Sequence, residues 1–323
     1  MRRLLLEMTD IRELAERIRR NVAKVIVGKD DVIELILISL IAGGHVLLED
    51  VPGTGKTLLA KSIARSLSCT FKRVQFTPDL LPSDISGINF YSQKSGEFEF
   101  HPGPLFSHIL LADEINRATP RTQSSLLEAM EERQVSVDGE TRRLEAPFLV
   151  LATQNPVENQ GTFPLPEAQL DRFLLKISMG YPSTEESVTL LKRFKEQNPL
   201  EEIGAVATRE ELAEAQESYA KVAVSDDILR YLIQLVEKTR SHPDLLLGVS
   251  PRGSQAMLKA AQVLAILRGR DYVLPDDIKV LMKPLFGHRI LLRNHVRAAS
   301  GLAEQILDRI AADTPVPAES GIL

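Results

Sequence analysis

The stretch from Val46 to Thr57 restricts the possible folds of this chain more than any other. Four residues that read as a buried strand, Val46–Glu49, run into Asp50-Val-Pro-Gly53-Thr-Gly55-Lys56-Thr57, and a helical pattern follows. In a phosphate-binding loop, glycines let successive backbone N–H groups turn inward, a lysine meets the β- and γ-phosphate oxygens, and a Ser or Thr hydroxyl reaches Mg²⁺. The stretch therefore predicts such a loop at a helix N-terminus, although Asp50 stands where the GxxxxGK[ST] pattern has its first glycine.

Short apolar runs alternate with helical patterns over residues 44–180. Each run has four or five residues bounded by Gly, Pro or Asp, which is typical of strands buried on both faces of a parallel sheet. The expected strands are Val46–Glu49, Arg73–Phe76, Ile109–Ala112, Phe148–Ala152 and Leu174–Ser178. The alternation predicts an α/β domain with a five-stranded parallel sheet.

Two hairpins interrupt this alternation. Asp138-Gly139, between Gln134–Val137 and Glu140–Leu144, suits a two-residue type I′ turn. A second hairpin is expected from Ile88–Tyr91 and Glu97–His101. From Thr184 onward strand signals vanish and only helical patterns follow, so we expect an α/β nucleotide-binding domain over 1–183, an all-α lid domain over 184–312 and a disordered tail over 313–323.

Composition excludes several classes of protein. Among 323 residues, 39 Lys and Arg stand against 44 Asp and Glu, a net charge of −5, whereas a domain that grips nucleic acid normally has a basic excess. The lone cysteine, Cys69, excludes a disulfide framework and is expected as a small core residue. No apolar run approaches the ~18 residues of a membrane span, and the N-terminal run of three leucines is too short for a signal peptide. We expect a soluble, cytoplasmic chain.

Polar residues follow two more of the expected strands. Asp113 and Glu114 end the run Ile109–Ala112, where Asp113 can hold Mg²⁺ and Glu114 can polarise an attacking water; a solvated acidic turn is the alternative. Asn155 follows Phe148–Ala152 at the edge where an open α/β sheet binds its ligand, and it can bond the γ-phosphate or the water, or simply start an Asn-Pro turn.

These motifs, in this order, resemble those of the AAA+ ATPases. Further strings are similar to those of the MoxR subfamily over roughly residues 10–310, and that subfamily carries inserted hairpins, here at about 86–102 and 133–146, and often replaces the first loop glycine. The strings are Leu48-Glu-Asp-Val-Pro-Gly53, Phe98-Glu-Phe-His-Pro-Gly-Pro-Leu105, Asp113-Glu-Ile-Asn-Arg117-Ala, Ala152-Thr-Gln-Asn-Pro156 and Leu165-Pro-Glu-Ala-Gln-Leu-Asp171.

The resemblance implies a set of site residues and cofactors. Arg172 looks like the arginine finger that reaches a neighbouring subunit's γ-phosphate, and Arg252 looks like the sensor-2 arginine; an ordinary surface pair and a helix-start residue are the alternatives. Arg117 lines the interface or caps a turn. ATP and Mg²⁺ are the implied cofactors, with Thr57 and Asp113 as metal ligands and Lys56, Glu114, Asn155, Arg172 and Arg252 as catalytic residues. The implied nucleotide contacts are Val27, Gly28, Pro52, Gly53, Thr54, Gly55, Lys56, Thr57, Leu58, Asp113 and Arg252.

Physical reasoning supports a ring. Arg172 precedes the last expected strand, away from the phosphate loop, so reaching an adjacent copy's γ-phosphate is easier than reaching its own, and head-to-tail interfaces then close a ring. The resemblance implies a hexamer that remodels, matures or inserts metal into a client protein, plausibly one with a von Willebrand factor A domain. Two other functions stay open: a DNA-translocating motor, disfavoured because the hairpin Gln134–Leu144 lacks a basic excess, and a nucleotide-gated scaffold with slow turnover.

Overall fold

A computed structural model describes residues 2–51, 53–155, 161–196, 198–293 and 301–317. Its centre is one parallel sheet with the strand order β2-β5-β8-β1-β9. The strands are β1 (Val46–Glu49), β2 (Phe71–Gln75), β5 (Ile109–Asp113), β8 (Leu149–Gln154) and β9 (Leu175–Ile177). The predicted α/β class and five-stranded parallel sheet are confirmed, and the motifs at the ends of β1, β5 and β8 therefore share one edge.

The sheet is buried on both faces because its central strands are apolar at every position before their polar carboxyl ends. Val46 and Leu48 belong to one hydrophobic cluster, whereas Leu47, between them, belongs to the other. The first cluster holds α1 (Arg2–Ala23), α2 (Asp30–Ile41) and α3 (Lys56–Ser66), and it continues into the C-terminal helices. The second holds α5 (Pro120–Glu132) and the inner side of a hairpin.

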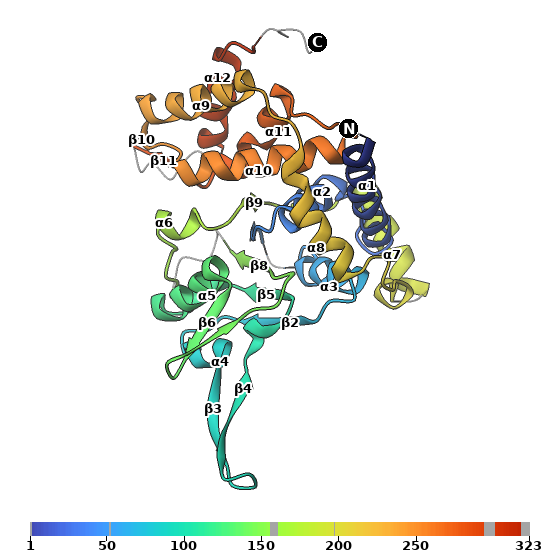
Figure 1. Ribbon diagram of the computed structural model, residues 1–323, viewed down its shortest axis with the longest axis vertical. Coiled ribbons are helices and arrows are strands. Elements are labelled where there is room, and N and C mark those ends of the chain that lie inside the picture. The colour runs from blue at the N-terminus through green and yellow to red at the C-terminus, as the bar shows by residue number, and fades with distance from the viewer. Residues whose placement is uncertain (1, 52, 156–160, 197, 294–300, 318–323) are drawn as a thin grey trace.

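Both predicted hairpins are present. In β6 (Gln134–Val137) and β7 (Glu140–Arg143), the turn residues Asp138 and Gly139 both have positive φ, 50° and 84°, as a type I′ turn requires. The other hairpin, β3 (Gly87–Ser92) and β4 (Glu97–Pro102), projects far from the body of the molecule in Figure 1. Two short helices bracket it, α4 (Pro82–Ser86) and the 3-10 turn η1 (Pro104–Phe106).

The remaining helices form two groups. Along the core lie α7 (Thr184–Glu196), the 3-10 turn η3 (Pro199–Glu202) and α8 (Arg209–Ser218) (Figure 1). The lid above the sheet comprises α9 (Asp226–Ser241), α10 (Pro251–Leu267), α11 (Pro275–Phe286) and α12 (Leu302–Asp313), entered through the 3-10 turn η4 (Tyr219–Lys221). Two more short helices lie between strands: the 3-10 turn η2 (Ile115–Arg117) follows β5, and α6 (Glu167–Leu170) precedes β9.

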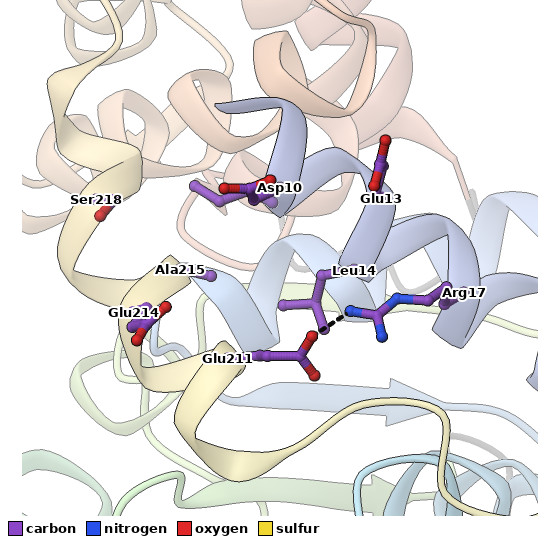
Figure 2. A pocket seen from close by; sticks show the side chains of 9 residues that line it. Asp10, Glu13, Leu14, Arg17, Glu211, Glu214, Ala215 and Ser218 are labelled. Atoms are coloured by element: carbon purple, nitrogen blue, oxygen red, sulfur yellow. Dashed lines mark hydrogen bonds and ion pairs between the residues drawn. The ribbon is translucent and has the colours of Figure 1, made fainter. Parts of the chain in front are cut away.

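The group with α7 and α8 packs on the core helices, although it falls within the segment expected as lid. The Val206 and Ala207 amides donate to the Ser66 carbonyl on α3, and the Gln216 side chain donates to the Leu40 carbonyl on α2. Figure 2 shows α8 beside α1, joined by an Arg17–Glu211 ion pair of 2.5 Å.

The lid is helical but not all-α as expected. Leu245–Leu247 (β10) and Leu291–Leu292 (β11) form a two-stranded antiparallel pair. Strands this short carry no alternation that sequence reading can detect. The last helix, α12, is described from Leu302, and residues 294–300 lie outside the described residues. Thr314, in the expected tail, is buried and bonds to the Ile310 carbonyl, while 318–323 lie outside the described residues.

No helix in the described ranges is both long enough and apolar enough to cross a membrane. The predicted core position of Cys69 corresponds to a half-buried thiol that packs against the first cluster. Burial raises the pKa of this thiol to about 11, so it stays protonated and chemically quiet near neutral pH.

Candidate functional site

The loop between β1 and α3 has the backbone of an anion-binding turn. Gly53 and Gly55 adopt φ of 84° and 92°, a region that side chains with a Cβ rarely enter. Apart from the residues adjacent in the chain, no described atom lies within 4 Å of where a Cβ would stand on either. Gly55 is the N-cap of α3, and the helix starts at Lys56 without an acidic residue in its first turn. The free N–H groups and the positive end of the helix dipole thus face an open space suited to phosphate.

Lys56 lies folded over this loop. Its Nζ donates to the Val51 carbonyl at 2.8 Å and to the Asp50 carbonyl at 3.2 Å. Both acceptors are neutral, so a phosphate oxygen would be a stronger partner for the ammonium group. The lysine is therefore held near the loop while remaining able to turn toward an anion.

A cavity of about 380 Å³, here called the phosphate cavity, opens above the loop. Its walls come from the ends of β1, β2, β5 and β8 and from the first turn of α3. The residues that line it are Asp50, Gly53, Gly55, Lys56, Thr57, Leu58, Arg73, Gln75, Asp113, Glu114, Thr153, Gln154 and Asn155.

The two carboxylates at the end of β5 lie in different surroundings. Asp113 accepts a 2.5 Å bond from the Thr153 hydroxyl and pairs with Arg73 at 2.7 Å. Glu114 sits on the sharp turn after the strand with φ 57° and ψ 50°, a conformation that is uncommon for a residue with a side chain and tends to occur at functional sites. Its carboxylate accepts from Gln75 at 2.7 Å and pairs with Arg117 at 3.1 Å.

The donor set at this edge fits a magnesium ion. Mg²⁺ takes only one or two protein oxygens and keeps water and phosphate oxygens as its other ligands. Thr57 offers a hydroxyl and Asp113 a carboxylate, and both line the phosphate cavity. Nowhere in the described ranges do three His, Cys, Asp or Glu side chains gather as a cage for a metal ion.

The end of β8 supplies uncharged polar groups. Asn155 is 8% exposed and lines the phosphate cavity, and Thr153, two residues earlier, both donates to Asp113 and accepts from the Glu114 amide at 2.9 Å. Thr153 thus joins the end of β8 to the end of β5 and fixes the spacing between their polar residues.

Gly28 belongs to a second cavity, here called the base cavity, of about 1160 Å³ between α2, the end of β9 and the lid helices α11 and α12. Glu49 and Met179 line the base cavity on the side of the sheet, and Lys283 lines it on the side of the lid. The space around the Gly28 Cα is filled by the Glu186 side chain, because a Cβ there would lie 1.6 Å from its carboxylate oxygen. Val27, next to Gly28, is half-buried.

Arg172 and Arg252 line neither cavity. Both guanidinium groups pair with one carboxylate, Glu131 at the end of α5: Arg172 at 3.0 Å, and Arg252 through the other carboxylate oxygen. The three side chains, here called the arginine cluster, are each between 29% and 42% exposed. The structure therefore brings the two predicted arginines together, but not into the cavity that the Lys56 of their own chain lines.

Buried groups hold the backbone behind the arginine cluster. The Asp171 carboxylate accepts from the buried Arg289 at 2.7 Å and from the Ser250 hydroxyl at 2.7 Å. His288 contacts the Phe173 carbonyl at 3.1 Å, and His45 contacts the Met130 carbonyl at 3.0 Å. Burial lowers the pKa of His45 to about 3 and the pKa of His288 well below its usual value, so both rings are neutral at pH 7.

A third hollow, about 540 Å³ between α1 and α8, is chemically unsuited to a triphosphate. Figure 2 shows Asp10, Glu13 and Glu214 around it, together with the Arg17–Glu211 pair. Four carboxylates around one paired arginine would repel phosphate. The phosphate cavity remains the candidate site.

Sequence reasoning found most of the residues that meet in the phosphate cavity. The eight predicted residues that line it are Gly53, Gly55, Lys56, Thr57, Leu58, Asp113, Glu114 and Asn155. Thr54 lies in the loop and bonds to the Val51 carbonyl, whereas Pro52 is outside the described residues. Arg73 and Gln75 were missed, and their alternation along an edge strand was the available signal. Glu131 was missed because nothing local marks it.

Comparison with known proteins gives consistent matches over most of the chain. Residues 45–175 match the model of the ATPase family associated with various cellular activities (AAA), and residues 237–310 match the AAA lid domain. The Bacillus subtilis protein YeaC is 49% identical over 310 residues, which cover 96% of this chain and 97% of YeaC. Chaperone MoxR1 of Mycobacterium tuberculosis is 42% identical over 311 residues, covering 94% of this chain and 82% of MoxR1. A protein of Cytophaga hutchinsonii whose crystal structure is known superposes with a TM-score of 0.90 at 39% identity, covering 97% of each chain.

Proposed function

This chain belongs to the MoxR family of AAA ATPases, and from that premise we propose that it hydrolyses ATP at the seams of a ring to remodel a client protein. One observation carries the proposal. The phosphate cavity is built within one chain, but the two arginines that phosphoryl transfer would use lie outside it, together on Glu131.

Within one chain, the residues of the phosphate cavity would hold the nucleotide. Backbone N–H groups of residues 53–57 and the Lys56 ammonium bind the β- and γ-phosphates, and Asn155 bonds the γ-phosphate or the attacking water. Glu114 orients that water. Thr57 and Asp113 hold Mg²⁺, which when bound neutralises negative charge on the phosphate oxygens.

The base of the nucleotide would occupy the base cavity beside Val27 and Gly28. Glu49 lines this cavity and Asp50 lines the phosphate cavity, so consecutive residues separate the two spaces. A ligand with a base at one end and phosphates at the other matches this arrangement. We propose that the chain divides into a core over 1–183 and a lid over 184–312, with the base bound between them.

An adjacent copy would complete the site. The transition state places extra negative charge on the γ-phosphate oxygens, and an added arginine accelerates such transfers by roughly 10³–10⁵. Arg172 and Arg252 share Glu131 in the free subunit, and a neighbour's γ-phosphate would compete with Glu131 for both. A head-to-tail contact repeated around an axis gives a closed ring, which we propose is a hexamer.

A mixing experiment tests the seam directly. Glu114→Gln and Arg172→Ala should each lower turnover by at least ~100-fold. When the two variants are coexpressed in equal amounts, seams that pair an intact Glu114 with a neighbour's intact Arg172 form at random, and turnover should recover to about a quarter of the wild-type rate.

The matched control replaces one partner by the double variant. Glu114→Gln mixed with the Glu114→Gln/Arg172→Ala chain has no complete seam, so turnover should stay at the level of the single variants. Equal turnover in the two mixtures would mean that Arg172 does not act across a seam. Wild-type turnover in either single variant would refute the proposed chemistry itself.

The client is proposed on the resemblance, with support from MoxR1, which is named a chaperone. We propose a cytoplasmic partner with a von Willebrand factor A domain, whose metal site would be assembled or filled. The Glu114→Gln chain should retain such a partner in ATP and release it in ADP. Retention that is equal in both nucleotides would contradict remodelling.

Neither alternative gains support from the hairpins. Arg142 on β7 pairs with Glu140 at 2.5 Å and packs over the Phe100 ring at 4.0 Å, so its charge is already engaged inside the molecule. Salt-dependent DNA binding would nevertheless restore the motor hypothesis. If hydrolysis is very slow and partner capture depends on ATP binding alone, the nucleotide-gated scaffold would be favoured.

A further inference from the structure

Asp50 is a buried carboxylate at the start of the phosphate loop. Only 7% of it is exposed, and its two oxygens accept three backbone hydrogen bonds: Oδ1 from the Val51 amide at 2.8 Å, and Oδ2 from the Met179 and Gly180 amides at 2.9 and 2.8 Å. Its main chain is engaged as well, since its amide donates to the Gln154 carbonyl and its carbonyl accepts from Lys56. Every polar group of Asp50 therefore fixes some part of the site.

The far end of these bonds lies in the wall of the base cavity. Met179 lines the base cavity directly after β9, and Gly180 follows with φ 62°. The next carbonyl, that of Tyr181, accepts from the Lys29 ammonium at 3.2 Å, and Lys29 lines the same cavity beside Gly28. Hydrogen bonds at both ends of the Met179–Tyr181 backbone thus connect the phosphate loop, through Asp50, to the loop that holds Gly28.

We infer that Asp50 is a positioning residue that ties the phosphate loop to the wall of the base cavity, so that binding favours ligands which fill both cavities. The inference rests on the proposed function, because it takes the ligand to be a nucleoside triphosphate. The Asp50 carboxylate, which replaces the first glycine of the loop pattern, thereby has a selective role. It increases the affinity for nucleotides and leaves the affinity for a bare polyphosphate unchanged.

The chemistry at this position requires a carboxylate. Three N–H donors converge on it, and an ionised carboxylate is the side chain that offers only acceptors. Asparagine would turn its own N–H₂ toward at least one of these donors. Glycine would leave all three donors without a side-chain acceptor. A buried donor without an acceptor is costly, which makes Asp50→Asn and Asp50→Gly informative substitutions.

Calorimetric titration with two probes separates the roles. For Asp50→Asn and Asp50→Gly we expect ATP to bind about tenfold more weakly and inorganic tripolyphosphate less than about twofold more weakly, both with magnesium. In turnover assays the KM for ATP should rise about tenfold while kcat changes less than about twofold. Equal weakening of both probes would reduce Asp50 to a local support of the phosphate loop, and unchanged ATP binding in Asp50→Gly would show that the motif glycine serves equally well; either result overturns the inference.

Asp277→Asn is the matched control. Asp277 is also a fully buried carboxylate that accepts a backbone bond, from the Leu274 amide at 2.8 Å, and it pairs with Arg270 at 2.6 Å, but it lies in the lid at the start of α11. Asp277→Asn should lower the thermal midpoint and leave the affinity for ATP within about twofold of wild type. An equal loss of ATP affinity in Asp277→Asn would make the Asp50 result a general effect of instability and overturn the inference.

If the Asp50 variants do not fold, hydrogen exchange in the wild-type chain still tests the inference. ATP should slow hydrogen exchange at the Met179 and Gly180 amides about tenfold, and tripolyphosphate by less than about twofold. Exchange that ATP leaves unchanged overturns the inference. If the wild-type chain binds no ATP at all, the proposed function is refuted. If the wild-type chain binds and hydrolyses ATP normally and the Asp50 variants keep the same ATP affinity, only the role of Asp50 is refuted.

Discussion

The phosphate cavity and the arginine cluster both contain cationic and anionic side chains, but only the phosphate cavity encloses a space that a ligand can fill. In the phosphate cavity, cations, carboxylates and amides from four strand ends converge on one space of about 380 Å³. In the arginine cluster, two guanidinium groups share a single carboxylate at the surface. The difference teaches that the groups suited to a triphosphate converge within one chain, whereas Arg172 and Arg252, which we propose act on a neighbour's transition state, lie outside that cavity.

The largest expected effect separates ATP binding, which should depend on the phosphate cavity, from turnover, which should also depend on the arginine cluster. Lys56→Ala should abolish both, because Lys56 lies in the phosphate cavity. Arg172→Ala should lower kcat by about 10³-fold or more and leave the Kd for ATP within about threefold, because Arg172 would contact only the neighbour's transition state. Titration calorimetry and a phosphate-release assay give the two quantities.

Arg121→Ala is the control for that prediction, because Arg121 is an exposed arginine on α5. It should leave both constants near wild type. If Arg172→Ala weakens ATP binding as strongly as Lys56→Ala does, the two regions are not separate, and the comparison fails.

The next effect follows from the two buried histidines, which contact the backbone next to the arginine cluster; His45 also accepts a bond from the Val150 amide on β8 at 3.0 Å. His45 contacts the carbonyl before Glu131, and His288 contacts the carbonyl after Arg172. The pKa of His45 is about 3 in the folded chain and near 6.5 when unfolded, so stability is complete above pH 6.5 and falls as the pH drops toward 3. At pH 5 the loss through His45 alone is about 2 kcal/mol.

Urea unfolding at pH 7 and pH 5 measures this loss, and His45→Asn should reduce it because asparagine carries no titrating ring. His101→Asn, at an exposed histidine on β4, should leave it unchanged. The same pH slope in His45→Asn as in wild type would remove the histidine from the explanation.

The smallest effect concerns the shared carboxylate. Glu131→Gln removes the charge that holds Arg172 and Arg252 in the free subunit, and partly exposed ion pairs of this kind are worth about 0.2–1 kcal/mol each. Release of the arginines should therefore become easier, with kcat rising about two- to fivefold and no change in thermal midpoint beyond a few degrees. A fall in kcat would show that Glu131 orients the arginines and does not restrain them.

Most of the fold was predictable because its signals are local. The strand Val46–Glu49 was predicted with its observed ends, and the Asp138-Gly139 turn has the backbone its residues demand. The strand β2 was placed too late, at Arg73–Phe76 in place of Phe71–Gln75, because Lys72 and Arg73 are exposed on an edge strand and interrupt the apolar run.

The site was predictable only as far as motifs reach. Lys56, Asp113 and Asn155 follow strands whose carboxyl ends meet, so their convergence could be foreseen from topology. The pairing of Glu131 with Arg172 and Arg252 spans 41 and 121 residues, 172 − 131 and 252 − 131, and depends on how the lid packs on α5. Their catalytic roles, like those of the other site residues, stay predictions until the variants are measured.

The attachment of Asp171 has a mechanical consequence. Its carboxylate is fastened to Ser250, where α10 begins, and to Arg289, just beyond α11, so the peptide that leads into Arg172 is pinned at two points of the lid. A swing of the lid must either carry this peptide along or rupture both attachments. The orientation of the lid and the position of the Arg172 guanidinium are therefore coupled, so that one cannot change without the other while both attachments hold.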